Sequence, residues 1–224
     1  MFSLKNNLPF PLKLVGGLAI VLFLSGLIWL LVPGDGNNKW GKFSGSPAVT
    51  LLDNGRDLRL EKDFFYTDPR GKLWVAEKAS EVNGASIPRS FWTIVGGPLE
   101  GKYRNASIIH DVACVKMAEP WEAVHMAFYE ACRCGGTGEK HAKILYAAVY
   151  HAGPRWKLRA VQAVSASEGP DGKVINKTTT RYVPERIATD DAFNDTATER
   201  KLKEKLSTEN LTLEQIRDID LKSL

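Results

Sequence analysis

The feature that most constrains this chain is an uncharged apolar stretch at residues 14–32, LVGGLAIVLFLSGLIWLLV. At a helical rise of about 1.5 Å per residue it would span roughly 28 Å, close to the hydrocarbon thickness of a bilayer. A helix of this length that is apolar on every side is more typical of a membrane span than of a buried helix in a soluble core. A cleaved signal peptide fits less well, because its apolar region is shorter and ends in a small-x-small cleavage site. We therefore predict a single-pass transmembrane helix.

The charges that flank this stretch do not fix its orientation. Lys5 and Lys13 precede it, and Lys39 and Lys42 follow it, so the positive-inside rule gives a tie. A short leading segment and a long following domain favour an N-terminus inside the cell. We therefore expect an inner (cytoplasmic) membrane protein that has the membrane as a partner and its soluble domain on the periplasmic side.

Composition divides the rest of the chain. Residues 1–13 form an N-terminal tail, and residues 33–47 read as a linker because they are rich in Gly, Ser and Asn. Residues 48–160 carry the periodic apolar patterns of a globular domain. Residues 161–224 are polar and lack a sustained period, so we expect a mostly disordered tail with short helices. Its apolar stripes are weak, which favours a solvated tail over one that docks on a partner.

The globular domain begins with strand patterns. The turn sequence Asp-Pro-Arg-Gly at residues 68–71 lies between two strand-like segments, and in the second segment Leu73 and Val75 alternate with other residues. This pattern predicts a small antiparallel sheet or hairpin between about residues 49 and 78.

Helical patterns follow the strands, with Pro at starts and Gly at ends. The expected helices cover residues 88–95, 102–117, 120–133 and 138–152. The predicted fold class is therefore α+β: a small antiparallel sheet or hairpin, then a compact cluster of about four helices, preceded by the transmembrane helix.

Charge and cysteine usage exclude some functions. The chain has 30 basic and 26 acidic residues, and no basic block with interleaved aromatics. Nucleic acid is therefore not expected as a partner. Three cysteines are too few, and odd in number, for a disulfide scaffold.

All four histidines and all three cysteines fall between residues 110 and 151. His110 and Cys114 are four residues apart on one expected helix, and His125 and Cys132 are seven apart on the next, so each pair shares a helix face. Two packed helices could bring these side chains together as ligands for tetrahedral zinc. His110 and His125 are the stronger metal candidates. Alternatively, the cysteines are small buried hydrophobes and the histidines are hydrogen-bonded in the core.

The same residues could perform acid–base chemistry. His110 and His125 could act as acid and base near neutral pH if they face each other, and Asp111 could orient one of them. Adjacent side chains on a helix point about 100° apart, so His110 and Asp111 cannot pair with each other. A structural role for both histidines is the alternative.

Ser86 raises the question of a serine nucleophile. Its surroundings, Gly-Ala-Ser-Ile-Pro, lack the second glycine of a G-x-S-x-G elbow, because Pro88 takes that position. A serine two residues before a helix-opening proline is better read as an N-cap. We expect Asn83, Ser86 and Arg89 to line a binding pocket.

Four segments, NGASIPRSFW, GPLEGKYRNASIIHD, EAVHMAFYEACRCGG and AKILYAAVYHAGPRW, together resemble DUF1353, a phage- and prophage-associated family of unknown function. The resemblance covers about residues 50–157. It implies that Asn83, Ser86, His110, Asp111 and His125 share one locus. In the family pattern, aspartates stand at the positions of Asn83 and His125, whereas Ser86, Arg89, His110 and Asp111 match.

Two functions are expected from these features. The first is a membrane-anchored accessory protein of a phage or prophage, which acts at the cell envelope by binding a phage or envelope protein. The alternative is a membrane-anchored hydrolase with a cell-wall or peptide substrate and a site at His110, Asp111 and His125, in which zinc is a candidate cofactor.

Overall fold

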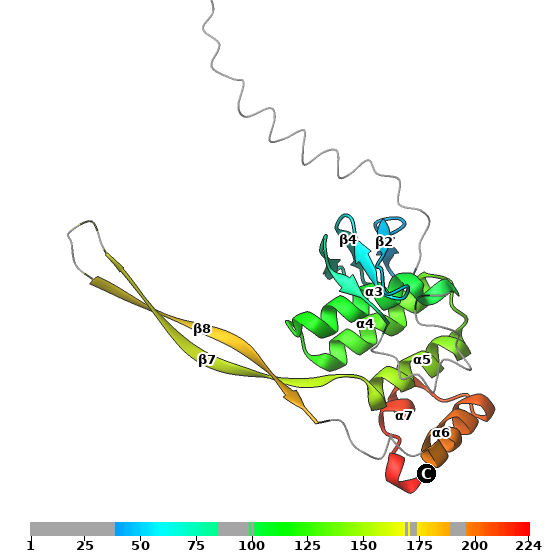
Figure 1. Cartoon of the computed structure of the whole chain (residues 1–224). Coiled ribbons are helices and arrows are strands. Elements are labelled where there is room, and N and C mark those ends of the chain that lie inside the picture. The colour runs from blue at the N-terminus through cyan, green and yellow to red at the C-terminus, as the bar shows by residue number, and fades with distance from the viewer. Residues whose placement is uncertain (1–38, 85–98, 100, 169, 171–173, 189–195) are drawn as a thin grey trace, which may run out of the picture. The chain divides into compact units, whose positions relative to one another are not determined.

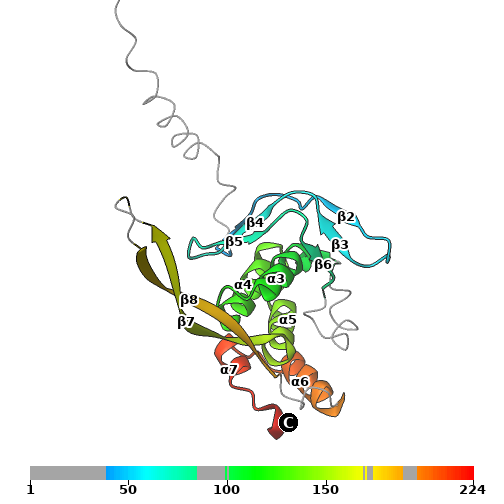
Figure 2. The same cartoon turned by 60° about the vertical axis from the view of Figure 1, so that its left-hand side comes forward.

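The computed structural model describes residues 39–84, 99, 101–168, 170, 174–188 and 196–224. These residues lie in one compact unit, Asn38–Leu224. The fold is α+β, as predicted, with small antiparallel sheets followed by packed helices. Figures 1 and 2 show the small sheets against α3 and α4, and the C-terminal helices on the far side of α5.

Two three-stranded antiparallel sheets open the described region. The first has the order β1-β4-β5 and the second the order β2-β3-β6. Their strands are β1 (Lys42–Phe43), β2 (Val49–Leu51), β3 (Leu58–Leu60), β4 (Phe64–Thr67), β5 (Leu73–Ala76) and β6 (Glu81–Val82).

The predicted hairpin is confirmed as β4 and β5, which pair with Tyr66 opposite Trp74. In the turn between them, Asp68 Oδ1 accepts the backbone N–H groups of Arg70 (2.9 Å) and Lys72 (3.0 Å). Gly71 has φ = +83°, a conformation that glycine adopts without a steric penalty. The Asp-Pro-Arg-Gly sequence therefore determines this turn through local chemistry.

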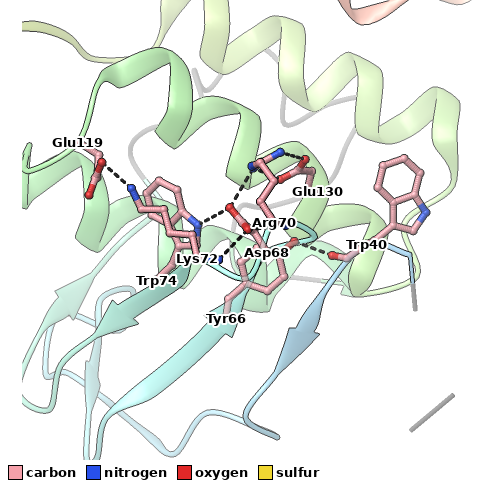
Figure 3. Close-up of polar contacts among 8 residues, drawn as sticks. All are labelled: Trp40, Tyr66, Asp68, Arg70, Lys72, Trp74, Glu119 and Glu130. Atoms are coloured by element: carbon pink, nitrogen blue, oxygen red, sulfur yellow. Dashed lines mark hydrogen bonds and ion pairs between the residues drawn. The ribbon is translucent and has the colours of Figure 1, made fainter. Parts of the chain in front are cut away.

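A polar cluster attaches the hairpin to the helices (Figure 3). The Arg70 guanidinium donates to both carboxylate oxygens of Glu130 on α4, each at 2.7 Å, and to Asp68 Oδ2 at 2.9 Å. Trp74 Nε1 also donates to Asp68 Oδ2, at 3.2 Å. Beside this cluster, Tyr66 donates its hydroxyl to the Trp40 carbonyl at 2.6 Å.

The helical predictions for residues 102–117, 120–133 and 138–152 are confirmed. The structure has the 3-10 helix η2 (Gly101–Tyr103), followed by α3 (Arg104–Lys116), α4 (Trp121–Cys134) and α5 (Glu139–Ala152). Their apolar faces form most of the core, together with Leu60, Phe64 and Tyr66 from the strands. The expected short helix at residues 88–95 lies outside the described residues.

The segment expected to be disordered is instead ordered where the structure describes it. It forms a two-stranded antiparallel ribbon of β7 (Arg155–Glu168) and β8 (Val174–Ile187), then α6 (Thr196–Thr208), α7 (Leu213–Arg217) and η4 (Leu221–Ser223). The predicted domain boundary at residue 160 therefore falls inside a strand. Figure 1 shows the ribbon running away from α4 and α5 for most of its length.

The C-terminal helices pack against α5. Leu202 and Leu206 lie one turn apart on α6, and both are buried, as is Ile216 on α7. His151 on α5 donates from Nε2 to the Ile216 carbonyl at 2.7 Å. Thr212 begins α7 with a full capping box. Three buried apolar side chains are enough to dock these helices, even though their stripes are weak in the sequence.

The structure corrects the predicted inner-membrane location. Among the described residues no helix has both the length and the apolar character needed to cross a bilayer. The longest helices there, α4 and α5, have 14 residues each. They are about 21 Å long, against a hydrocarbon core of about 30 Å. The predicted span itself, residues 14–32, lies outside the described residues.

Candidate functional site

The candidate site lies where α3 packs against α4. His110 and Cys114 are one helical turn apart on α3, so their side chains project from the same face. His125 projects toward them from the first half of α4. All three side chains are buried, and His125 has no exposed surface.

The two histidines are in direct contact. His110 Nε2 lies 2.8 Å from His125 Nδ1, a hydrogen-bond distance. Cys114 Sγ lies 3.6 Å from the same His110 nitrogen. The ring of Phe128 lies against His110, with ring centroids 4.6 Å apart, and Trp121 lies against His125 at 5.4 Å. These aromatic contacts limit the rotation of both imidazoles.

Burial keeps both imidazoles neutral. It lowers the pKa of His110 well below 6.5, and the neighbouring His125 lowers it further. Burial also lowers the pKa of His125 to about 3, while the Pro154 carbonyl raises it slightly and Arg155 lowers it. Two neutral imidazoles at 2.8 Å share a single proton, so one ring donates and the other accepts. The ring that donates therefore keeps a free lone pair on its other nitrogen, whereas the ring that accepts carries its own proton there.

Asp111 has a different role from the histidines. Its Oδ2 accepts the backbone N–H groups of Asn83 (3.2 Å) and Gly84 (2.5 Å). Gly84 has φ = +66°, so a glycine suits this bend. Asp111 therefore positions the start of the Asn-Gly-Ala-Ser-Ile-Pro segment against α3, while the His110 side chain turns toward α4.

A cavity of about 270 Å³ reaches the site from the side of the sheet. Its lining residues come from β6, α3, the start of β7 and β8: Glu81, Val82, Asn83, Asp111, Cys114, Val115, Pro154 and Arg186. Cys114 belongs both to the histidine cluster and to this wall. Of the three cluster residues only Cys114 lines this cavity, so it lies between the cavity and the two histidines.

The predicted site residues have different outcomes. The structure brings His110, Cys114 and His125 together and places Asn83 and Asp111 at the adjacent cavity. Cys132 is buried on α4, but it is not part of this group. A spacing of seven residues from His125 keeps the same helix face yet moves the side chain about 10 Å along the axis. Ser86 and Arg89 lie outside the described residues.

The sequence did not point to Glu81, Pro154 or Arg186 as parts of the cavity wall. Arg186 is the clearest case, because it lies in the segment that the sequence assigned to a disordered tail. No local pattern marks a residue that reaches a site by strand pairing 30 positions away, as Arg186 does opposite Trp156. The place of Arg186 in the cavity wall follows only from the register of β7 and β8.

Comparison with known proteins identifies relatives but no activity. Residues 58–149 match the family model "Protein of unknown function (DUF1353)". An uncharacterised protein of Sinorhizobium fredii (strain NBRC 101917 / NGR234), y4jT, is 41% identical over 121 residues, which cover 53% of this chain and 36% of y4jT. A second from the same strain, y4iH, is 39% identical over 115 residues, covering 51% of this chain and 48% of y4iH.

These comparisons confirm the resemblance to DUF1353 over residues 58–149. The chain spans between about a third and half of the length of these two relatives. Their names carry no phage association, which stays a prediction. No solved structure matches the chain.

Proposed function

We propose that this DUF1353-like chain is a non-enzymatic accessory protein that binds a partner protein through the β7–β8 ribbon. The observation that supports this most is the ribbon itself. Two strands of 14 residues each pair along their whole length and extend beyond the helices. An isolated two-stranded ribbon is marginally stable at best in water, so a surface that covers it would stabilise it.

The ribbon is anchored firmly at its base. Trp156 is buried and donates from Nε1 to the Glu119 carbonyl at 2.7 Å. Arg155 donates to the Tyr150 carbonyl at 2.6 Å, and its guanidinium lies 4.8 Å from the centre of the Trp121 ring. The base is thus part of the core, and the ribbon is held out from it in a defined direction.

One face of the ribbon is apolar near its base. Directly paired residues of an antiparallel ribbon share a face, so Leu158 with Pro184, and Ala160 with Tyr182, continue the face that begins at Trp156 and Arg186. Farther out this face is mostly polar, with Val164 as an exposed apolar residue. The Tyr182 side chain is 67% exposed. Exposed aromatic and aliphatic side chains on one continuous face are typical of protein-binding surfaces.

The opposite face is basic in its charges, although Val161 and Val183 also lie on it. It carries Lys157, Arg159, Lys177 and Arg181 against a single acidic residue, Glu185. The four basic side chains belong to exposed residues and form no ion pair with the described residues. A partner protein with an apolar patch beside acidic residues would complement both faces. The apolar face favours a protein over nucleic acid, whose exposed backbone is charged throughout.

Site-specific photocrosslinking tests this proposal. A photoreactive residue at Tyr182 should give one protein adduct of defined mass in cells, whereas the same residue at exposed Glu204 on α6 should not give that adduct. Tyr182→Lys should abolish capture by a probe at Val164, which lies on the same face. Equal adducts from Tyr182 and Glu204, or an adduct of this chain with itself alone, would count against a partner protein.

A second candidate function is a hydrolase that uses the His110–His125 pair. The observation that favours it is a pair of neutral imidazoles in contact beside a cavity, which is an arrangement able to move a proton. Asp111 would position the 83–84 bend rather than take part in proton transfer. The predicted substrates are cell-wall material or peptides, so release of labelled fragments from both should be compared for the wild type and His110→Gln. Equal release by the two proteins would exclude this function.

A further inference from the structure

We infer that His110, Cys114 and His125 bind one zinc ion. The ligand atoms are His110 Nε2, His125 Nδ1 and Cys114 Sγ, and all three lie within 4.8 Å of one another. No other group of three His, Cys, Asp or Glu side chains in the described part of the chain meets this condition. The inference is independent of partner binding by the ribbon.

One of the three ligand distances matches tetrahedral coordination, and a second needs a small adjustment. Zn–N bonds of about 2.05 Å and a Zn–S bond of about 2.3 Å place two ligand nitrogens about 3.3 Å apart, and a nitrogen and a sulfur about 3.6 Å apart. The Cys114 Sγ to His110 Nε2 distance is 3.6 Å. The two nitrogens, at 2.8 Å, are about 0.5 Å closer than in a zinc site, as expected for a shared proton. Small rotations of the two rings would open this gap.

Zinc binds neutral imidazoles and a thiolate. For His110 Nε2 and His125 Nδ1 both to present lone pairs to the metal, the proton between the rings must move to the outer nitrogen of the ring that carried it, and the Cys114 thiol must release its proton to solvent. The ring protons then lie on the two remaining nitrogens.

The donor set selects the metal. Two imidazole nitrogens and one thiolate suit zinc, whereas Mg²⁺ and Ca²⁺ require oxygen ligands. Three protein ligands leave one tetrahedral position free. Because Cys114 also lines the 270 Å³ cavity, we assign the fourth position to a water molecule from that side.

Metal titration of the purified full chain tests the site. After treatment with a chelator, the wild type should take up one zinc per chain, measured by elemental analysis, and its thermal midpoint should rise. With Co²⁺ it should show the d–d bands of tetrahedral cobalt and a thiolate-to-cobalt charge-transfer band. His125→Gln should weaken zinc binding by more than about 100-fold, since even loss of an outer partner of a ligand costs 10- to 100-fold.

The cysteines provide a matched pair of variants. Cys114→Ser should remove the charge-transfer band, whereas Cys132→Ala, at a buried cysteine outside the cluster, should keep both the band and the stoichiometry. Far-UV circular dichroism confirms that each variant is folded. A folded wild type that binds less than one zinc at micromolar concentrations, or a Cys114→Ser variant that keeps the band, would overturn the proposal.

Discussion

Single residues decide how the sheet is held against the helices. Asp68 is buried at the β4–β5 turn, where it accepts hydrogen bonds from the Arg70 and Lys72 amides, the Arg70 side chain and Trp74. Burial raises the pKa of Asp68, but the hydrogen bonds and the charge of Arg70 outweigh it and bring the pKa below 3.8. This carboxylate is therefore stabilised in the folded protein.

Asp68→Ala should lower the free energy of unfolding by about 1–3 kcal/mol at pH 7, because it leaves buried donors without an acceptor. The pKa of Asp68 is lower in the folded state than in the unfolded chain, so its ionised carboxylate stabilises the folded protein above pH 3.8. This stabilisation is lost as the pH falls through the folded-state pKa. The difference between wild type and variant in urea unfolding should therefore shrink in acid. Glu119→Ala, which breaks the exposed pair with Lys72, is the control and should cost less than about 1 kcal/mol.

His151 gives a second prediction for a single residue. Unlike Asp68, it is a base, and the fold stabilises its neutral form. Burial lowers the pKa of His151 below 6.5, the bond to the Ile216 carbonyl raises it in part, and Arg155 lowers it. Because the folded state binds the proton less readily than the unfolded chain, stability is complete above pH 6.5 and falls as the pH drops below it.

His151→Gln can keep an N–H donor for the Ile216 carbonyl but does not titrate. Between pH 7 and pH 5 the variant should therefore lose less stability than the wild type in urea unfolding. Parallel stability curves for the two proteins across this range would contradict the assignment.

At the scale of elements, the sequence predicted the helices well where strong periodicity coincided with clear boundaries. Pro120 and Gly135 bound α4, and Gly153 follows α5. In the C-terminal segment the sequence predicted short helices, which α6 and α7 confirm, but it did not predict that they pack on the domain. Leu202 and Leu206 are nevertheless buried, because α5 offers them an apolar surface that no local pattern reveals.

Leu202→Ala should lower the free energy of unfolding by about 2–5 kcal/mol, the range for buried leucines. The comparison is Glu204→Ala on the exposed side of the same helix, which should change stability by less than about 0.5 kcal/mol. Equal, small effects from both substitutions in urea unfolding would show that α6 does not pack on α5 in solution.

Across the whole molecule, stability should be uneven. The strands, α3, α4 and α5 share one core, to which Trp156 belongs and from which most of the ribbon is excluded. Regions with few buried apolar contacts open more easily than the core.

Amide hydrogen exchange should therefore be fast in β7 after Leu158 and slow in α4, with Trp156 near the boundary. A partner that covers the ribbon should slow exchange in β7 and β8 selectively. Ribbon amides as protected as those of α4 in the isolated protein would contradict this distribution of stability.

By itself, the sequence determined the turn at residues 68–71, the three central helices and the concentration of histidines and cysteines on two of them. These features depend on local chemistry: fixed φ at proline, free φ at glycine and the 3.6-residue helical period. The tertiary structure decided which residues meet across the chain. It brought His110 and His125 together and left Cys132 outside their cluster. It also placed the backbone N–H groups of Asn83 and Gly84 within hydrogen-bond distance of Asp111. It also folded the polar C-terminal segment, because burial against α5 and pairing between distant strands depend on surfaces that no single segment encodes.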